Sequence, residues 1–109
     1  MPDAGSVIVV NFPGVTGMKR RPALILSSDE YHRARPDVIV GLITSQVQAA
    51  QATSDCAIQD WKSAGLRLPS AFRAFLTTLP RNVISAQIGT LSKHDWEAVR
   101  VCLDMALAR

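Results

Sequence analysis

Features typical of exported, membrane-spanning or metal-stabilised proteins are missing from this sequence. Its 109 residues include only two cysteines, Cys56 and Cys102. These lack the CxxC or Cys/His spacing of a zinc site or a disulfide framework, so we expect free, buried thiols and no metal. No apolar run approaches the roughly 20 residues that span a bilayer. Residues 1–5 lack the basic and apolar regions of a signal peptide, and we therefore expect a cytoplasmic protein.

Acidic residues are absent over a long stretch, from Trp61 to His94. Two interpretations fit this stretch: an electropositive surface, or solvated charges scattered over unrelated faces. The formal net charge of +3 permits a nucleic-acid partner without requiring one. The basic residues of the stretch are Lys62, Arg67, Arg73, Arg81 and Lys93.

The composition that remains is that of a small globular protein. Hydrophobic residues make up 48% of the chain and charged residues 19%, which is typical of a folded rather than a disordered sequence. A chain of this length buries roughly two-thirds of its unfolded surface. Because no linker or repeat divides it, we expect a single domain over residues 1–109.

Short β-branched and apolar segments alternate with turn residues along most of the chain. They predict strands at residues 6–12, 21–27, 37–44, 56–59, 70–75, 76–79 and 83–88, with a mobile connection at 45–54. Ser92 and Asp95 match a capping box that begins a final helix, whose apolar positions are Trp96, Val99, Leu103 and Leu107. Many short strands and one such helix predict a mainly β fold, a small bent sheet or barrel with the helix packed on it.

The most informative local pattern is Arg21-Pro22, followed by the apolar run 23–26. Because proline cannot donate to a sheet ladder, we place Pro22 at the first residue of a strand and Lys19-Arg20-Arg21 in the preceding loop. The next strand ends at Thr44. A planar guanidinium matches phosphate geometry, so Arg21 and a nearby threonine hydroxyl suggest binding or chemistry at a phosphodiester.

Several blocks of the sequence, in this order, resemble the MazF/PemK family of toxin endoribonucleases. The blocks cover residues 5–13, 19–27, 43–45, 59–61, 64–66, 69–70 and 88–92. The resemblance implies an SH3-like small β-barrel with appended helices, a fold shared with CcdB. It also implies a homodimer without a cofactor that cleaves single-stranded RNA independently of metal and binds an acidic cognate antitoxin.

The resemblance assigns the catalytic roles to Arg21 and Thr44. Attack of a ribose 2′-hydroxyl on its own phosphate needs stabilisation of a dianionic phosphorane, which suits Arg21, and Thr44 can hydrogen-bond a phosphoryl oxygen. The chain does not identify the general base. Further expected RNA contacts are Lys19, Arg20, Ser45, Gln46 and Trp61, although Trp61 also fits a place in the core.

The chain also departs from the family pattern, which leaves other functions open. Ser6 stands where relatives carry an aspartate, and the acidic, glutamine and arginine positions of later strands fall on Ala74, Phe75, Thr77 and Pro80. A non-catalytic RNA-binding or antitoxin-binding module and a CcdB-like gyrase inhibitor are the alternatives. The chain lacks the Trp-Gly-Ile ending of the gyrase poisons. Its two histidines, His32 and His94, are expected on the surface.

Overall fold

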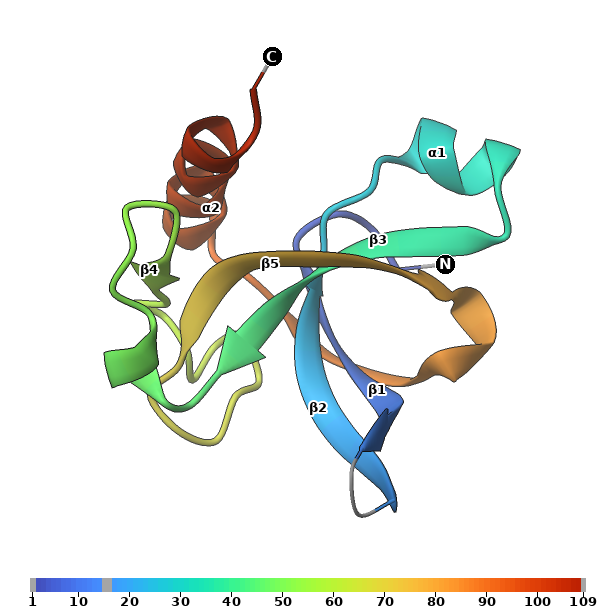
Figure 1. The fold of residues 1–109 in the computed structure, drawn as a ribbon, viewed down its shortest axis with the longest axis horizontal. Coiled ribbons are helices and arrows are strands. Elements are labelled where there is room, and N and C mark those ends of the chain that lie inside the picture. Colours follow the sequence, from blue (N-terminus) through green and yellow to red (C-terminus); the bar gives the residue numbers. More distant parts are fainter. Residues whose placement is uncertain (1, 15–16, 109) are drawn as a thin grey trace.

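A strongly bent antiparallel sheet of six strands forms the body of the molecule (Figure 1). The computed structural model describes residues 2–14 and 17–108. The strands lie in the order β4-β5-β3-β2-β1-β6. Their bounds are β1 Ser6–Gly14, β2 Gly17–Ile25, β3 Asp37–Thr44, β4 Cys56–Ala57, β5 Ala71–Pro80 and β6 Ile84–Thr90.

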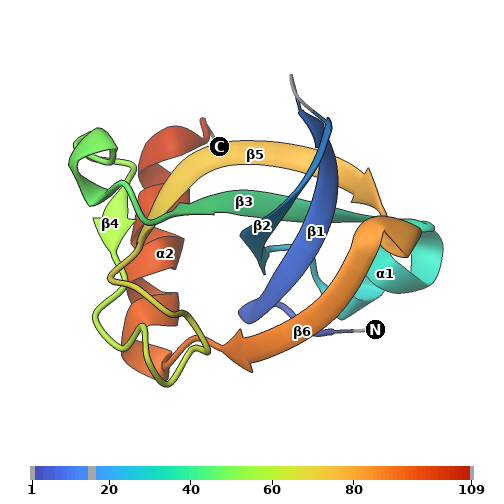
Figure 2. The same ribbon diagram turned by 90° about the horizontal axis from the view of Figure 1, so that it is seen from below.

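Two α-helices and two single-turn 3-10 helices complete the described part of the fold. Helix α2 lies beside β4 at one end of the molecule, and α1 lies at the other end (Figures 1 and 2). No helix among the described residues is long and apolar enough to cross a membrane. The helices are α1 Asp29–Ala34 and α2 Lys93–Ala106, and the 3-10 turns are Val47–Ala49 and Arg81–Val83.

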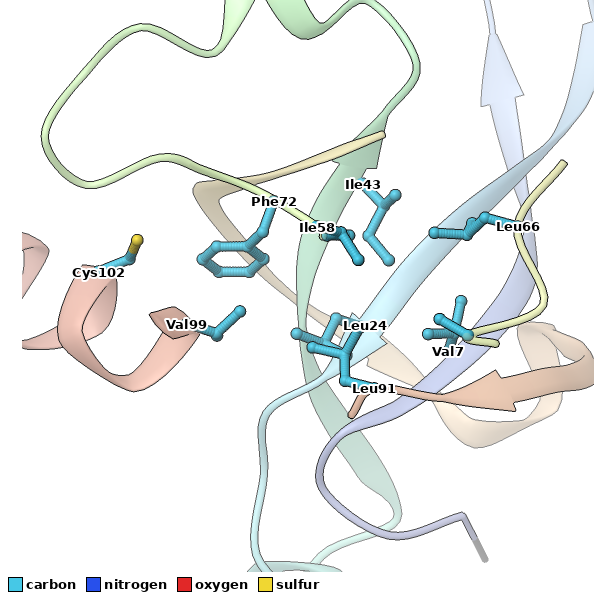
Figure 3. Packing of buried hydrophobic residues seen from close by; sticks show 10 residues of the cluster. Val7, Leu24, Ile43, Ile58, Leu66, Phe72, Leu91, Val99 and Cys102 are labelled. Atoms are coloured by element: carbon cyan, nitrogen blue, oxygen red, sulfur yellow. The ribbon is translucent and has the colours of Figure 1, made fainter. Parts of the chain in front are cut away.

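Each face of the sheet has its own apolar core, because successive side chains of a strand point to opposite faces. Val7 and Leu24 belong to the core on the side of α2, which we call the helix-side core and which includes Phe72 and Val99 (Figure 3). Their neighbour Ile8 belongs to a second core on the other face. The members of this second core are Ile8, Val10, Ala23, Ile25, Val38 and Val40.

The C-terminal helix forms and packs as the sequence predicts. Ser92 is its N-cap, and the Ser92 hydroxyl accepts a hydrogen bond of 3.2 Å from the backbone N–H of Asp95. Val99 and Cys102 are buried in the helix-side core. Leu107 was expected on the same apolar stripe, but the helix ends at Ala106 and 44% of Leu107 is exposed. The predicted mainly β fold with a helix packed on the sheet is confirmed.

The predicted position of Pro22 at the start of a strand is wrong. Strand β2 begins five residues earlier, at Gly17, and pairs with β1 through Pro22 and the basic residues before it. Strand β3 pairs with β2 only at residues 23–25. Pro22 therefore lies in a part of β2 with a strand on one side only, where a missing backbone donor is tolerated. Lys19, Arg20 and Arg21 consequently lie on a strand and not in a loop.

The later strands also differ from the prediction. Residues 70–75 and 76–79 form one continuous strand, β5, which bends at an irregularity opposite Gly41 and Leu42 in β3. Gly41 permits the close packing there, because a Cβ at this position would lie 2.4 Å from the ring of Phe72. The strand predicted at 56–59 shortens to β4, and Ile58, just after it, is buried in the helix-side core.

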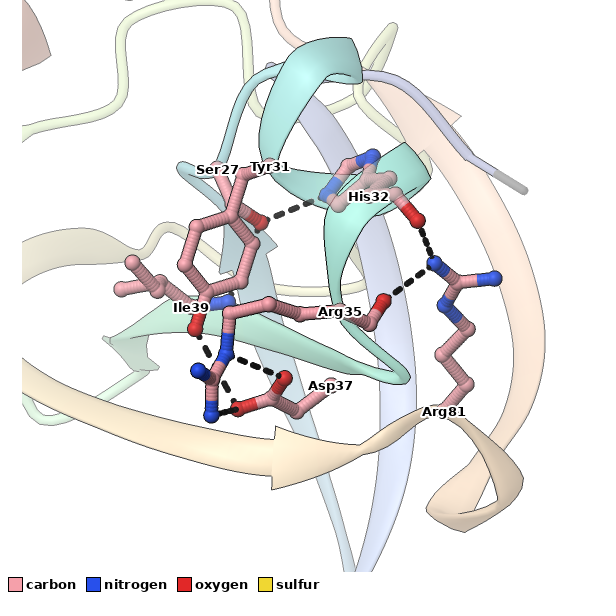
Figure 4. Close-up of polar contacts among 7 residues, drawn as sticks. All are labelled: Ser27, Tyr31, His32, Arg35, Asp37, Ile39 and Arg81. Carbon is pink, nitrogen blue, oxygen red and sulfur yellow. Dashed lines mark hydrogen bonds and ion pairs between the residues drawn. The ribbon is translucent and has the colours of Figure 1, made fainter.

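The expectation that His32 is exposed is also wrong. His32 is 8% exposed, and its Nε2 lies 2.6 Å from the Ser27 hydroxyl, which also accepts a hydrogen bond from the backbone N–H of Ile39 (Figure 4). Arg81 donates hydrogen bonds to the carbonyl oxygens of His32 and Arg35. These contacts attach α1 to the sheet, so His32 has a structural place that its polar sequence context did not reveal.

Candidate functional site

A cleft of about 780 Å³ opens where strand ends from both halves of the sheet meet the loop before β5. Four arginines line it, and no aspartate or glutamate of the described residues does. A cleft lined by charges of one sign concentrates ligands of the opposite sign. Its lining residues are Val9, Arg20, Arg21, Pro22, Leu42, Ile43, Thr44, Ser45, Gln46, Gly65, Leu66, Arg67, Leu68, Ser70, Arg73 and Ile88.

Arg21 and Thr44 line this cleft from neighbouring strands. In the β2–β3 ladder Ala23 pairs with Leu42, and this is the last pair before the two strands separate, two residues short of both Arg21 and Thr44. Residues two apart on a strand point to the same face, so the two side chains project on one side of the sheet. The fold therefore brings a guanidinium and a hydroxyl into the lining of one cleft.

The hydroxyl of Thr44 is oriented by the turn that follows β3. Thr44 Oγ1 accepts a hydrogen bond of 3.1 Å from the backbone N–H of Gln46. Since a hydroxyl carries one proton and two lone pairs, this bond leaves its proton available to donate to a ligand. Ser45 and Gln46 are exposed and line the same cleft.

The other predicted contact residues divide between the cleft and its surroundings. Arg20 is exposed and lines the cleft, whereas Lys19 is exposed on β2 outside the lining. Trp61 also lies outside it, half-buried against the helix-side core, with Lys62 Nζ 5.4 Å from its ring centroid. This position favours the alternative that Trp61 serves the core.

The acid-free stretch supplies cleft residues that the sequence did not single out. Arg67 and Arg73 line the cleft, whereas Arg81 is used to hold α1. Both interpretations of this stretch are thus partly right: it contributes an electropositive surface, but only through two of its five basic residues. Sequence alone could not separate them, because the loop before β5 has no periodic pattern.

That loop is held by a buried carboxylate and by glycine packing. Asp95, 1% exposed, accepts hydrogen bonds of 2.9 and 2.8 Å from the backbone N–H groups of Gln59 and Asp60. Gly65 has φ +85°, and a Cβ there would lie 2.0 Å from a carbonyl oxygen of β6. These contacts fix the loop against the sheet at the edge of the cleft.

Other chemically reactive groups lie elsewhere. The two cysteines are free, and neither they nor the histidines line the cleft. Burial and a hydrogen bond with Cys102 raise the pKa of Cys56 to about 12, so this thiol stays protonated at neutral pH. The described residues contain no group of three or more histidine, cysteine, aspartate or glutamate side chains arranged to hold a metal.

The bent sheet and the arginine-lined cleft define a small β-barrel protein equipped to bind an anionic ligand. A family model described as "PemK-like, MazF-like toxin of type II toxin-antitoxin system" matches residues 3–107. The chain belongs to this toxin family, which confirms the resemblance seen in the sequence. No curated protein matches the chain by sequence.

Solved structures share the fold at low sequence identity. An endoribonuclease from a mycobacterial species, in complex with its cognate antitoxin, is 19% identical with a TM-score of 0.79, covering 97% of this chain and 94% of that one. The Mycobacterium tuberculosis toxin MazF-mt6 is 22% identical with a TM-score of 0.75, covering 93% and 94%. A MazE-MazF structure from Deinococcus radiodurans is 22% identical with a TM-score of 0.75, covering 98% and 95%.

Proposed function

We propose that this toxin is an endoribonuclease that cleaves single-stranded RNA without a metal ion, by attack of a 2′-hydroxyl on the adjacent phosphate. The observation that carries the proposal is the placement of Arg21 and Thr44 in one cleft, which four arginines and no carboxylate side chain of the described residues line. Membership of the toxin family supports it, and so does the likeness in fold to the mycobacterial endoribonuclease.

In the proposed reaction the 2′-oxygen forms a bond to phosphorus and the bond from phosphorus to the 5′-oxygen breaks. The products are a 2′,3′-cyclic phosphate and a 5′-hydroxyl. The guanidinium of Arg21 pairs with two phosphoryl oxygens and stabilises the charge that develops on them. The Thr44 hydroxyl donates a hydrogen bond to a phosphoryl oxygen, in the orientation fixed by the hydrogen bond that it accepts from the backbone N–H of Gln46.

The residues that line the cleft decide which groups can accept or supply a proton during the reaction. Arginine does not deprotonate at ordinary pH, so Arg21 cannot serve as the base. Because no histidine or carboxylate of the described residues lines the cleft, we assign both proton transfers to solvent: water accepts the 2′-hydroxyl proton, and water supplies the proton that the leaving 5′-oxygen takes up. Solvent catalysis predicts a slow enzyme whose single-turnover rate increases with pH in the neutral range.

The remaining contacts and partners form part of the same proposal. Arg20, Ser45 and Gln46 contact the RNA inside the cleft, and Lys19 contacts it beside the cleft. The structures in complex with antitoxins support an antitoxin partner here, and an acidic segment suits this basic cleft. We further propose that the toxin acts as a homodimer in the cytoplasm, where its RNA substrate is found.

The test is cleavage of a single-stranded RNA of mixed sequence by purified protein in EDTA, with product ends identified by mass spectrometry. We expect cyclic-phosphate ends, and a loss of about a hundredfold or more in rate for Arg21→Ala, since one donor to the developing charge contributes about 2.7–4 kcal/mol. Thr44→Val should also be slow. Arg33→Ala, an exposed arginine on α1, is the control. Intact RNA with folded wild-type protein contradicts the proposal, and a parallel gyrase supercoiling assay tests the CcdB-like alternative.

A further inference from the structure

Arg73 carries the most unusual polar environment in the cleft. Its side chain is 38% exposed and lines the cleft, yet its Nε is buried without a hydrogen-bond partner. The nearest acid oxygen, Asp55 Oδ2, lies 4.0 Å from this nitrogen, beyond hydrogen-bonding distance. The Arg73 side chain thus lies beside a carboxylate without a hydrogen bond from its Nε to that group.

Asp55 is itself firmly held. Its side chain is 7% exposed, and its two oxygens accept hydrogen bonds of 3.2 and 3.3 Å from the backbone N–H groups of Ala52 and Ala74. The second of these groups belongs to the residue that follows Arg73 on β5. One carboxylate therefore attaches the preceding turn to β5 and lies beside the Arg73 side chain.

The register of the sheet places Arg73 beside the proposed catalytic pair. Thr44 pairs with Ala71 in the β3–β5 ladder, so Arg73 is the diagonal neighbour of Thr44, two residues further along β5. Diagonal neighbours have Cβ atoms roughly 7–8 Å apart, within reach of a long side chain. Arg21 lines the same cleft from β2, the strand on the other side of β3.

We propose that Arg73, positioned by Asp55, binds the RNA phosphate next to the scissile one. This inference rests on the proposed function for its ligand, since it deepens the same site. The offset of Arg73 along β5 separates it from the phosphate held by Arg21 and Thr44. The contact is made before the reaction and kept through it, so it strengthens RNA binding and leaves the chemical step unchanged.

Binding is measured with an oligonucleotide that cannot be cleaved, in which every ribose is replaced by deoxyribose. We expect Arg73→Ala to weaken binding about tenfold. The plot of log affinity against log salt concentration should lose about 0.7 from its slope, the value of one single-strand phosphate contact. On cleavable RNA the same variant should raise KM about tenfold with kcat within about threefold of wild type.

The matched control is Arg33→Ala, which removes the same charge outside the cleft. If Arg73→Ala matches this control in affinity and in salt slope, the proposed contact is wrong. A loss confined to kcat also overturns it, because that result assigns Arg73 to the scissile phosphate. If wild-type protein leaves RNA intact, the proposed function fails, while the oligonucleotide measurement still decides whether Arg73 binds a phosphate.

The substitution Asp55→Asn distinguishes a role of Asp55 in positioning Arg73 from an effect of its negative charge on RNA binding. Removing a negative charge beside the cleft strengthens RNA binding if Asp55 acts only through its field. Positioning predicts the opposite: binding about threefold weaker than wild type, and no such weakening when Arg73 is already alanine. A melting temperature within a few degrees of wild type confirms that the turn is intact. Tighter binding in both backgrounds overturns the positioning role of Asp55.

Discussion

Replacing Asp95 by alanine is expected to be the most damaging single change in the loop that borders the cleft. The carboxylate is 1% exposed and accepts two hydrogen bonds of 2.9 and 2.8 Å from the backbone of Gln59 and Asp60. Hydrogen bonds to charged groups contribute about 1.5–3 kcal/mol each, and the two N–H groups lose their acceptor together. The expected loss in the free energy of unfolding is about 3 kcal/mol or more.

The assay is urea denaturation followed by tryptophan fluorescence. Trp61 and Trp96 both pack against the helix-side core, so the signal reports this region. Asp95→Asn keeps one carbonyl acceptor and should lose about half as much stability. Glu97→Ala, which removes an exposed acid of the same helix paired to Arg100 at 3.6 Å, should stay within about 0.5 kcal/mol of wild type.

The same substitution tests how the cleft is built. Because Asp95 holds the loop that carries Leu66, Arg67 and Leu68 to the cleft, RNA affinity should fall even at temperatures where the variant is folded. An Asp95→Ala protein that loses less than about 1 kcal/mol, with an unchanged denaturant slope, refutes the reasoning. In that case the loop is held by its apolar contacts alone.

Three other outcomes are expected. Gly65→Ala should lower the free energy of unfolding by about 2 kcal/mol or more, since a Cβ there meets a carbonyl oxygen of β6 at 2.0 Å. Gly17→Ala is the control and should lower it less, because Gly17 has φ +122° but open space around it. Equal losses of stability for the two variants in thermal melts would contradict the clash at Gly65. Cys56, with its pKa raised to about 12, should react with iodoacetamide at pH 8 at least about a hundredfold more slowly than in the urea-unfolded chain. A hydrogen bond from Arg35 lowers the pKa of Asp37, so the stability that this pair provides is present above about pH 4 and lost as the pH falls through the pKa of the folded state. Asp37→Asn should therefore reduce the fall in melting temperature between pH 5 and 3. An unchanged pH profile of the melting temperature would count against the pair.

Much of the secondary structure was predictable because local patterns dictate it. Residues 37–44 were predicted exactly as β3, since a β-branched run ends there in polar residues. The N-terminus of α2 was also predicted, from Ser92 and the helical spacing after it. The prediction failed at Pro22. The rule that proline cannot donate to a sheet ladder is correct, but it does not exclude proline from a stretch of strand that has a neighbour on one side only. Proline was tolerated within β2 because β3 does not extend alongside it.

The candidate site was predicted in part. Arg21 and Thr44 were singled out in the sequence, and both line the cleft. Arg73 and Asp95 were not, because their significance depends on residues far away in the chain. Asp95 was expected to complete a capping box, yet its carboxylate binds backbone groups 35 and 36 residues earlier. Such long-range pairing leaves no periodic signal.

The sequence by itself determined the strand at residues 37–44, the start of the last helix and the family that the blocks resemble, because each depends on neighbouring residues and on residue type. Tertiary structure alone decided which cations share the cleft: Arg67 and Arg73 line it, whereas Arg81 holds α1. The physical reason is that a charge acts through its position in space. That position is set by sheet register and by the buried hydrogen bonds of distant residues.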